Sequence, residues 1–272
     1  MRITSMNAVA TNRQGDSAGA ENGEAKNWPM SSPKQTEAGR AEGFLPIFLD
    51  VRDRLCLVVG GGPMALQKIR DLLDCKARVH LVAPAAARCI EDIESHPGFR
   101  WSKRLPCEKD VSESYLVFAS DEPVEGEQPV HYRHLEELRE MADRHGRLYN
   151  ALDHRELCHF TNPSVARNAP LVVAISTGGS SPVLGQFLRD RIRSEILTDT
   201  HASFARFLGQ YRKRIRSLIP DYGKRREFYQ SLIDTGFIAF LRDTNEEEAL
   251  SELIRRVAEY RKEKGYEEEA VR

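Results

Sequence analysis

Short apolar runs alternate with amphipathic segments between residues 55 and 176. The runs predict buried strands, because a strand covered on both faces carries apolar residues without interruption. They occupy residues 55–59, 77–83, 99–101, 115–119, 148–152 and 171–176. Helical spacing of apolar residues follows the first run and recurs at 90–94 and 129–145. This alternation predicts an α/β fold of the Rossmann type, with an open and mostly parallel sheet.

The pattern changes after residue 182. From there only helical periodicity continues, over residues 183–197, 201–218, 224–241 and 246–264, with breaks at 221–223 and 243–245. Residues 1–42 carry few large apolar side chains, so their burial cannot offset the entropy cost of ordering. The chain is therefore predicted to comprise a disordered leader over 1–42, a nucleotide-binding Rossmann domain over 43–182 and an all-helical region over 183–272.

A glycine-rich turn ends the first predicted strand. The spacing Gly60-x-Gly62-x-x-Ala65 fits the dinucleotide fingerprint in its G-x-G-x-x-A form. Glycines permit a tight turn and a close approach to a pyrophosphate, and the helix that follows offers free N–H groups to phosphates. The predicted cofactor contacts are Gly60, Gly61, Gly62, Pro63 and Met64 in this turn, with Pro84 and Ala85 after the second strand. An ordinary strand-to-helix turn remains the alternative for the spacing taken alone.

The second predicted strand lacks the acidic residue that usually holds the adenosine ribose. Its end reads Val82-Ala83-Pro84-Ala85, so backbone groups around Pro84 and Ala85 are expected to make the cofactor contact there. NAD and NADP therefore both stay open on the physical pattern alone.

Polar residues follow the other predicted strands at their carboxyl ends. They are Ser120 and Asp121, which are also expected to contact the cofactor, then Asn150 and Asp153, then Ser176, Thr177, Gly178, Gly179 and Ser180. Ligands of open α/β sheets bind outside this edge, so these groups are expected to face one crevice together with the glycine turn. Asp153 fits a general base there or a helix cap, and the pattern leaves both interpretations open.

The composition describes a globular protein, with 40% hydrophobic and 30% charged residues. The formal net charge of −1 gives no overall field that favours nucleic acid or an anionic membrane. The five cysteines are scattered, with no C-x-x-C and no zinc-ligand spacing. Since no signal peptide and no bilayer-length apolar run is present, we predict a cytoplasmic protein without a membrane partner.

Basic residues concentrate in the helical region. A solvated face, a nucleic-acid surface and a site for a polyanionic small molecule are the open interpretations. Few aromatic residues lie among them, which argues against binding of single-stranded nucleic acid. The residues are Arg189, Arg191, Arg193, Arg206, Arg212, Lys213, Arg214, Arg216, Lys224, Arg225 and Arg226.

Four motifs resemble one known family. They are F-L-P-I-F-L-D-V-R-D-R-L-C-L-V-V-G-G-G at 44–62, Y-N-A-L-D at 149–153, L-V-V-A-I-S-T-G-G-S-S-P-V-L at 171–184, and G-K-R-R-E-F-Y at 223–229. In this order they resemble the precorrin-2 dehydrogenase/sirohydrochlorin ferrochelatase family, the N-terminal module of siroheme synthase. The resemblance covers about residues 44–230.

The resemblance implies NAD-dependent oxidation of precorrin-2 to sirohydrochlorin, and many members of the family also insert ferrous iron to give siroheme. It implies a homodimer with an interface in the helical region, a tetrapyrrole substrate and no nucleic-acid partner. Asp153 takes the position of the family's catalytic aspartate. The residues expected at the substrate are Asn150, Ser176, Thr177, Gly178, Gly179 and Ser180. No dedicated set of metal ligands appears, and His154 and His159 are expected to be structural or exposed.

Three parts of the chain depart from the resemblance. They are the leader 1–42, a long connection over 122–133 and the helices beyond about residue 237. A dehydrogenase that leaves iron insertion to another enzyme is one alternative. An NAD-sensing regulator that binds DNA is a second, although no DNA-reading domain precedes the first strand.

Overall fold

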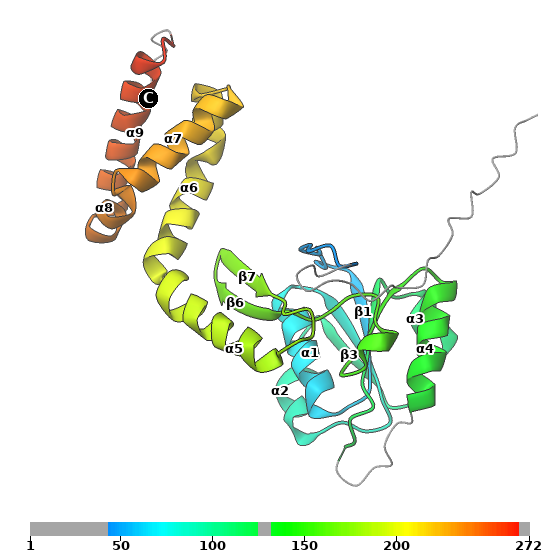
Figure 1. Ribbon diagram of the computed structural model, residues 1–272. Coiled ribbons are helices and arrows are strands. Elements are labelled where there is room, and N and C mark those ends of the chain that lie inside the picture. Colours follow the sequence, from blue (N-terminus) through cyan, green and yellow to red (C-terminus); the bar gives the residue numbers. More distant parts are fainter. Residues whose placement is uncertain (1–42, 125–131, 267–272) are drawn as a thin grey trace, which may run out of the picture. The chain divides into compact units, whose positions relative to one another are not determined.

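The computed structural model describes residues 43–124 and 132–266. Five parallel strands form the main sheet in the order β3-β2-β1-β4-β5 (Figure 1). Their bounds are Leu55–Val59 for β1, Arg78–Val82 for β2, Phe99–Ser102 for β3, Leu116–Ala119 for β4 and Leu148–Ala151 for β5. The predicted Rossmann-type sheet is therefore confirmed, and its five strands lie within two residues of the predicted ranges.

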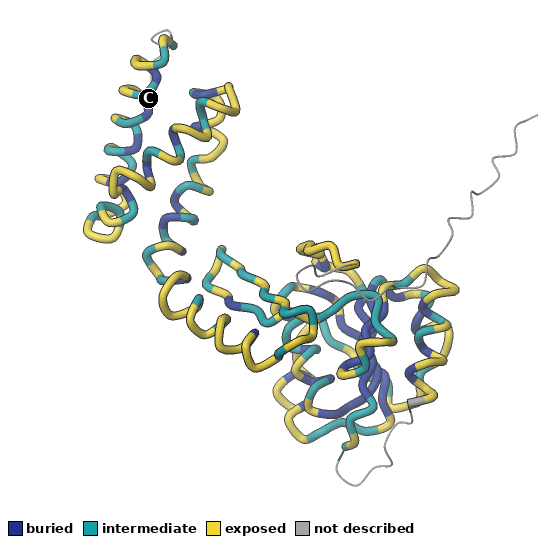
Figure 2. The backbone as a smooth tube through the Cα atoms, in the orientation of Figure 1, coloured by how far each residue is buried: buried dark blue, intermediate teal, exposed yellow. Residues whose placement is uncertain are grey.

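Helices cover both faces of this sheet. The apolar residues of β1 alternate between two cores, because Val58 packs with α1 (Pro63–Asp74) and Leu57 packs on the other face with α4 (Tyr132–Arg144). The shorter α2 (Glu91–Glu94) follows a 3-10 turn at Arg88–Ile90, and α3 is Glu108–Ser112. Figure 2 shows the strands as the most buried part of this domain. Coverage of both faces explains the uninterrupted apolar runs.

The last predicted strand is not part of the main sheet. Residues Leu171–Ile175 form β7, which pairs antiparallel with β6 (Ser164–Asn168) in a separate two-stranded sheet. The exposure of β7 alternates along the strand, as expected for a hairpin covered on one face only. The polar sequence of β6 gave no strand signal. The expectation that 171–176 extends the parallel sheet is therefore wrong.

Helices follow the hairpin to the end of the described chain. They are α5 (Pro182–Arg191), a π-helical turn at Ile192–Ile196, α6 (Asp199–Leu218), α7 (Tyr222–Asp234), α8 (Phe237–Asp243) and α9 (Glu246–Glu263). Aromatic residues from α6, α7 and α8 form a third core, which includes Phe204, Phe228 and Phe237. The helix predicted over 224–241 is interrupted, because Gly236 adopts the left-handed conformation with φ 72° between α7 and α8.

Two sequence predictions concern residues outside the described ranges. The leader 1–42 lies there entirely, and the long connection over 122–133 lies there in its central part, 125–131. Within the described ranges no helix has both the length and the apolar character needed to cross a bilayer.

Candidate functional site

The glycine turn packs tightly at the carboxyl ends of three strands. Val59 is the register partner of Val82 on β2 and of Ala119 on β4, so these three strand ends meet beside Gly60. Gly60 has φ 97°, and a Cβ there would collide with the carbonyl oxygen of Ser120. Both observations require glycine at this position.

Gly61 is crowded from the opposite side. A Cβ on Gly61 would collide with the carbonyl oxygen of Ala85 and lie 2.6 Å from the Cα of Ala86. The carbonyl of Gly61 accepts a hydrogen bond from Ala87 N at 2.9 Å. The turn and the segment after β2 are thus packed backbone to backbone. The fingerprint alone assigned no such role to Gly61.

A pocket of about 460 Å³ opens at this turn. It is lined by Val59, Gly60, Gly61, Val82, Ala83, Pro84, Ala85, Leu105, Pro106, Glu122, Pro123, Val124, His134, Glu137, Leu138 and Met141. Four predicted cofactor contacts, Gly60, Gly61, Pro84 and Ala85, therefore line one cavity. We call it the nucleotide pocket. Its apolar walls, its exposed backbone and the helix that starts at Pro63 suit a dinucleotide.

Three predicted cofactor contacts lie beside the pocket and do not line it. Gly62 and Pro63 are the N-cap and the first residue of α1, and Met64 N donates a hydrogen bond to Glu122 Oε2 at 2.6 Å. The carboxylate of Glu122 therefore occupies one of the N–H groups that the fingerprint offers to phosphate. Glu122 was not predicted as a site residue, although it follows directly after Ser120-Asp121 at the end of β4.

The last two predicted cofactor contacts face other partners. Ser120 is buried, and its hydroxyl accepts a hydrogen bond from Glu122 N at 3.2 Å. Asp121 Oδ2 lies 2.9 Å from His154 Nε2. Ser120 therefore supports the pocket wall from behind, and Asp121 connects the end of β4 with the turn after β5.

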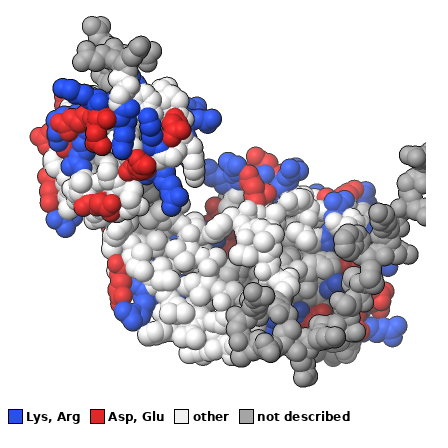
Figure 3. Space-filling model, turned by 45° about the horizontal axis from the view of Figure 1, so that its top comes forward, with Lys and Arg blue, Asp and Glu red and all other residues white. Residues whose placement is uncertain are grey.

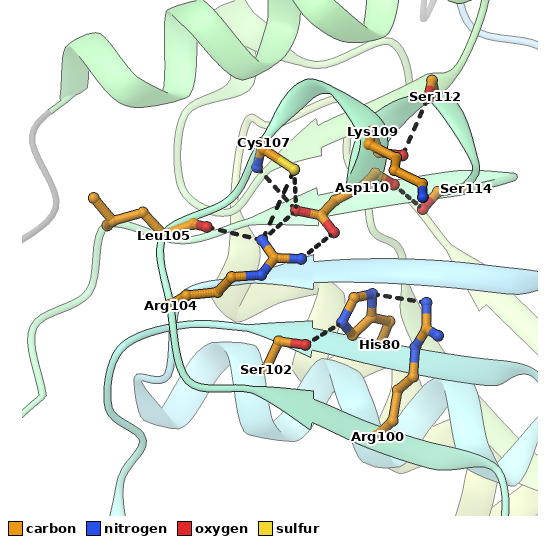
Figure 4. A network of polar contacts seen from close by, with 10 residues as sticks. All are labelled: His80, Arg100, Ser102, Arg104, Leu105, Cys107, Lys109, Asp110, Ser112 and Ser114. Carbon is orange, nitrogen blue, oxygen red and sulfur yellow. Dashed lines mark hydrogen bonds and ion pairs between the residues drawn. The ribbon is translucent and has the colours of Figure 1, made fainter.

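A polar network holds the outer wall of the nucleotide pocket (Figure 4). Both terminal nitrogens of Arg104 donate to the carboxylate of Asp110 at 2.7 Å, and Cys107 N donates to it at 2.9 Å. Burial of Asp110 opposes ionisation, but the hydrogen bonds from Arg104 and Cys107 outweigh it and hold the pKa of the carboxyl well below its usual range. The network fixes the loop that carries Leu105 and Pro106.

His80 is drawn in the same figure, but it connects strands of the sheet and is not part of the network around Asp110. Its ring nitrogens lie 2.9 Å from Ser102 Oγ and 3.1 Å from the guanidinium of Arg100. Burial lowers the pKa of His80, and the nearby positive charge of Arg100 lowers it further. His80 is thus a neutral link between β2 and β3 at neutral pH.

A second pocket, of about 410 Å³, lies at the turn after β5. Its lining includes five of the predicted site residues: Asn150, Asp153, Ser176, Thr177 and Gly179. The remaining lining residues are Ala151, His154, Arg155, Cys158, Phe160, Thr161, Asn162, Ser164, Ile175, Pro182 and Gly185. We call it the Asp153 pocket. Gly178 and Ser180 belong to the same turn but not to its lining.

The carboxylate of Asp153 is exposed and forms no hydrogen bond or ion pair with any other residue that the structure describes. Its backbone is left-handed, with φ 66°. The 3-10 turn that follows, Arg155–Leu157, has His154 as its N-cap residue and no side-chain cap. The helix-cap interpretation of Asp153 is therefore wrong, and its carboxylate is available to a ligand.

Side-chain hydrogen bonds hold the walls of the Asp153 pocket. Asn150 Nδ2 donates to the carbonyl of Phe160 at 2.7 Å, and Asn150 Oδ1 accepts from Asn162 at 2.9 Å. Arg155 Nη1 donates to the carbonyl of Gly178, which ties the turn after β5 to the glycine turn after β7. No local pattern in the sequence indicates a role for Arg155 or Asn162, since each contacts a partner distant in the chain.

The two histidines near Asp153 are engaged elsewhere. His154 pairs with Asp121, and His159 Nε2 lies 2.7 Å from Asp143 Oδ1 while its Nδ1 accepts from Tyr149 N. The structural role expected for both is confirmed. Over the described residues, no group of three or more His, Cys, Asp or Glu side chains is arranged to hold a metal ion.

Three family models match consecutive parts of the chain. They are described as "Putative NAD(P)-binding" over residues 47–164, "Sirohaem biosynthesis protein central" over 169–195 and "Sirohaem synthase dimerisation region" over 202–257. The siroheme synthase of Thioalkalivibrio sulfidiphilus is 35% identical over 218 residues, which cover 79% of this chain and 42% of that protein. The siroheme synthase of Nitrosococcus oceani is 31% identical over 207 residues, which cover 76% of this chain and 42% of that protein.

The domain models and the relatives that match this chain are those of the siroheme synthase family. This confirms the family predicted from the four motifs, and it agrees with the predicted NAD-type cofactor. The chain spans about 42% of the length of these two siroheme synthases. The match to the dimerisation region reaches residue 257, so the prediction that the resemblance fades beyond about 237 is wrong.

A solved structure has the same fold as this chain. It is "SirC, precorrin-2 dehydrogenase", with a TM-score of 0.59 and 21% sequence identity, and the match covers 78% of this chain and 100% of that one. The predicted architecture, a Rossmann-type sheet followed by helices, is therefore also found in a known protein.

Proposed function

We propose that the protein oxidises precorrin-2 to sirohydrochlorin, with NAD as the hydride acceptor. The observation that carries this proposal is the unpaired carboxylate of Asp153 in a pocket beside a nucleotide pocket. The Asp121–His154 pair joins the chain segments that line the two. The names of the relatives, siroheme synthase, and of the similar structure, precorrin-2 dehydrogenase, agree with this reaction.

The oxidation removes one hydride and one proton from the macrocycle. NAD supplies the hydride acceptor when it is bound in the nucleotide pocket. A carboxylate oxygen of Asp153 accepts the proton, as a general base must lie within hydrogen-bond reach of the proton it removes. The Ser176 hydroxyl accepts from Gly178 N at 3.2 Å and keeps its own proton to donate to a substrate group. Asn150 is bonded within the chain, so its proposed role is to hold the pocket wall.

The substitution Asp153→Asn tests the proposal. Asparagine tolerates the left-handed backbone of this position better than alanine and removes only the charge. We expect turnover of precorrin-2 with NAD under anaerobic conditions to fall by about 10²- to 10⁴-fold, while NAD affinity stays unchanged. Asp74→Asn, an exposed aspartate at the end of α1, is the matched control. Unaltered turnover of Asp153→Asn would remove Asp153 from the mechanism.

We propose ferrous iron insertion into sirohydrochlorin as a second activity of the same pocket. Insertion displaces two pyrrole N–H protons, and the unpaired carboxylate of Asp153 is suited to accept them. In this proposal the ring nitrogens hold the iron, which is a substrate. Iron insertion without NAD is measured for the wild type and for Asp153→Asn. Insertion that the variant loses supports this second activity. No insertion by the wild type indicates a dehydrogenase that leaves iron insertion to another enzyme.

We further propose a homodimer that uses the helical region, residues 183–272. Large apolar side chains on α5 are exposed, with 74% of Val183 and 55% of Phe187 accessible. Exposed apolar faces of this kind mark interaction surfaces. The description of the matching family model as a dimerisation region agrees with this proposal. Sedimentation of the full chain measures its mass directly. A monomer at micromolar concentration would contradict the proposed homodimer.

A further inference from the structure

A groove between α6 and α7 gathers four arginines. Its volume is about 480 Å³, and it is lined by Ala205, Leu208, Gly209, Arg212, Arg216, Tyr222, Arg225, Arg226 and Tyr229. The α6 residues recur at helical spacing, and so do those of α7, so that each helix contributes one face. None of these lining residues is acidic. We call this cavity the arginine groove.

The four guanidinium groups of the groove have no acidic partner among the described residues. None of Arg212, Arg216, Arg225 and Arg226 forms an ion pair with any residue in the described ranges. Arg225 is held in place by its own backbone contacts, since Nη1 donates to the carbonyls of Ile219 and Pro220 at 2.7 and 2.9 Å. Four positive charges therefore line one cavity without an ion-paired acid in the described part of the chain.

Five other arginines of the helical region pair with a nearby acid: Arg189 with Asp190, Arg191 with Glu195, Arg242 with Asp243, and Arg255 and Arg256 with Glu252. Arg193, Arg206 and Arg214, like the groove arginines, form no ion pair with a described residue, but they do not line the groove. Figure 3 shows basic and acidic atoms close together over the helical part on the face it draws. The arginine groove is thus distinguished by the gathering of four such arginines around one cavity.

Tyr229 adds an independent observation. Its hydroxyl is buried, yet it forms no hydrogen bond with any part of the chain that the structure describes. Burial raises the pKa of this hydroxyl, against the opposing effect of Arg212 and Arg225. A buried hydroxyl without a partner costs about 1–3 kcal/mol. A ligand oxygen bound beside these arginines would offer it an acceptor.

We propose that the arginine groove binds the carboxylates of an anionic small molecule and, resting on the proposed function, the acetate and propionate side chains of the tetrapyrrole. Planar guanidinium groups match carboxylates in a two-pronged geometry. Several arginines in one cavity suit a ligand with several carboxylates, and the Tyr222 and Tyr229 rings offer apolar surface beside them. The proposal gives Arg212, Arg216 and Arg226 a role in substrate binding. This is one of the interpretations that the sequence left open for the basic residues of the helical region.

Uroporphyrin, an unreactive macrocycle with eight carboxylates, is the probe. Its binding to the full chain is measured by fluorescence at physiological ionic strength without NAD. We expect the double variant Arg212→Gln/Arg216→Gln to bind it at least tenfold more weakly, since each lost charge-assisted contact is a large effect. Tyr229→Phe is expected to weaken binding severalfold without loss of stability. The matched control Arg242→Gln/Arg255→Gln, on ion-paired arginines, is expected to stay within twofold.

Three outcomes overturn the proposal. Uroporphyrin binding that is unchanged in the double variant does so, even if the wild type oxidises precorrin-2 and the proposed function stands. Tighter binding of random duplex DNA than of uroporphyrin, lost in the same variant, identifies a nucleic-acid surface instead. Dissociation of a dimer by the double variant identifies a second copy as the partner of these arginines. Conversely, loss of uroporphyrin binding in a protein that does not oxidise precorrin-2 supports the groove and refutes the proposed function.

Discussion

The nucleotide pocket and the Asp153 pocket are built from different parts of the chain. Apolar side chains and bare backbone line most of the first, where the ionisable residues are Glu122, His134 and Glu137. The second is lined largely by polar side chains, several of which hydrogen-bond to one another or to distant carbonyls. The space left between closely packed backbone segments therefore defines the first pocket, and polar side chains define the second.

This difference follows from what each pocket is proposed to bind. Phosphates are held well by backbone N–H groups, so a nucleotide pocket needs the chain to come close without intervening side chains. Proton transfer needs a titratable side chain, so a catalytic pocket must present one such as Asp153. An added methyl group should therefore damage the first pocket most, and a removed polar atom the second.

The largest effect is expected for Gly61→Ala. The new Cβ would collide with the Ala85 carbonyl and lie 2.6 Å from the Cα of Ala86, so the backbone after β2 must move. We expect NAD affinity, measured by calorimetry, to fall by about 100-fold or more, which corresponds to roughly 3 kcal/mol. Gly209→Ala is the control, because a Cβ there meets no atom within 4 Å. If Gly61→Ala binds NAD normally, the first pocket is not defined by backbone space.

Gly61 also illustrates what the sequence could predict. The apolar runs and the glycine spacing predicted β1, the turn and α1, because these depend on neighbours within about ten residues. The crowding of Gly61 depends on Ala85, which lies 24 residues away, and no local pattern reports it. The same holds for the link between Arg155 and Gly178.

The β6–β7 hairpin shows what the sequence could not predict. Residues 171–175 carry the apolar run of a buried strand, but pairing with β6 and not β5 decides which sheet they join. Pairing partners are a tertiary property, and the polar β6 gave no warning. Ser176 and Thr177 nevertheless line the same pocket as Asn150 and Asp153, although they do not follow a strand of the main sheet.

A smaller effect is expected for Asp110→Asn, which removes a charge from the network behind Leu105 and Pro106. The carboxylate accepts two bonds from Arg104 and one from Cys107 N, so we expect a loss of about 2 kcal/mol in the free energy of unfolding at pH 7. NAD affinity should change less than threefold, because this loop gives the pocket only apolar groups and backbone. A loss of affinity as large as for Gly61→Ala would break the contrast.

The pH dependence of the same variant gives a second readout. The pKa of Asp110 is lowered in the folded state, so its contribution to stability is fully present above the ordinary carboxyl value and is lost as the pH falls toward the folded value. The stability difference between wild type and Asp110→Asn should be constant above about pH 5 and shrink below about pH 4. Urea unfolding between pH 3 and pH 7 measures it, with Asp92→Asn on α2 as an exposed control.

The smallest effect is expected for Glu122→Gln, and it tests the contrast most sharply. Glu122 accepts the Met64 N–H at the start of α1, where its charge competes with a phosphate for the same helix end. Glutamine keeps an acceptor but loses the charge, so NAD affinity should rise about threefold, since a charge near a helix end is worth roughly 0.3–1 kcal/mol. Glu137→Gln, the other carboxylate of the lining, should change affinity less. Weaker NAD binding by Glu122→Gln would mean that the carboxylate serves the nucleotide directly, and the first pocket would then depend on a side chain as the second one does.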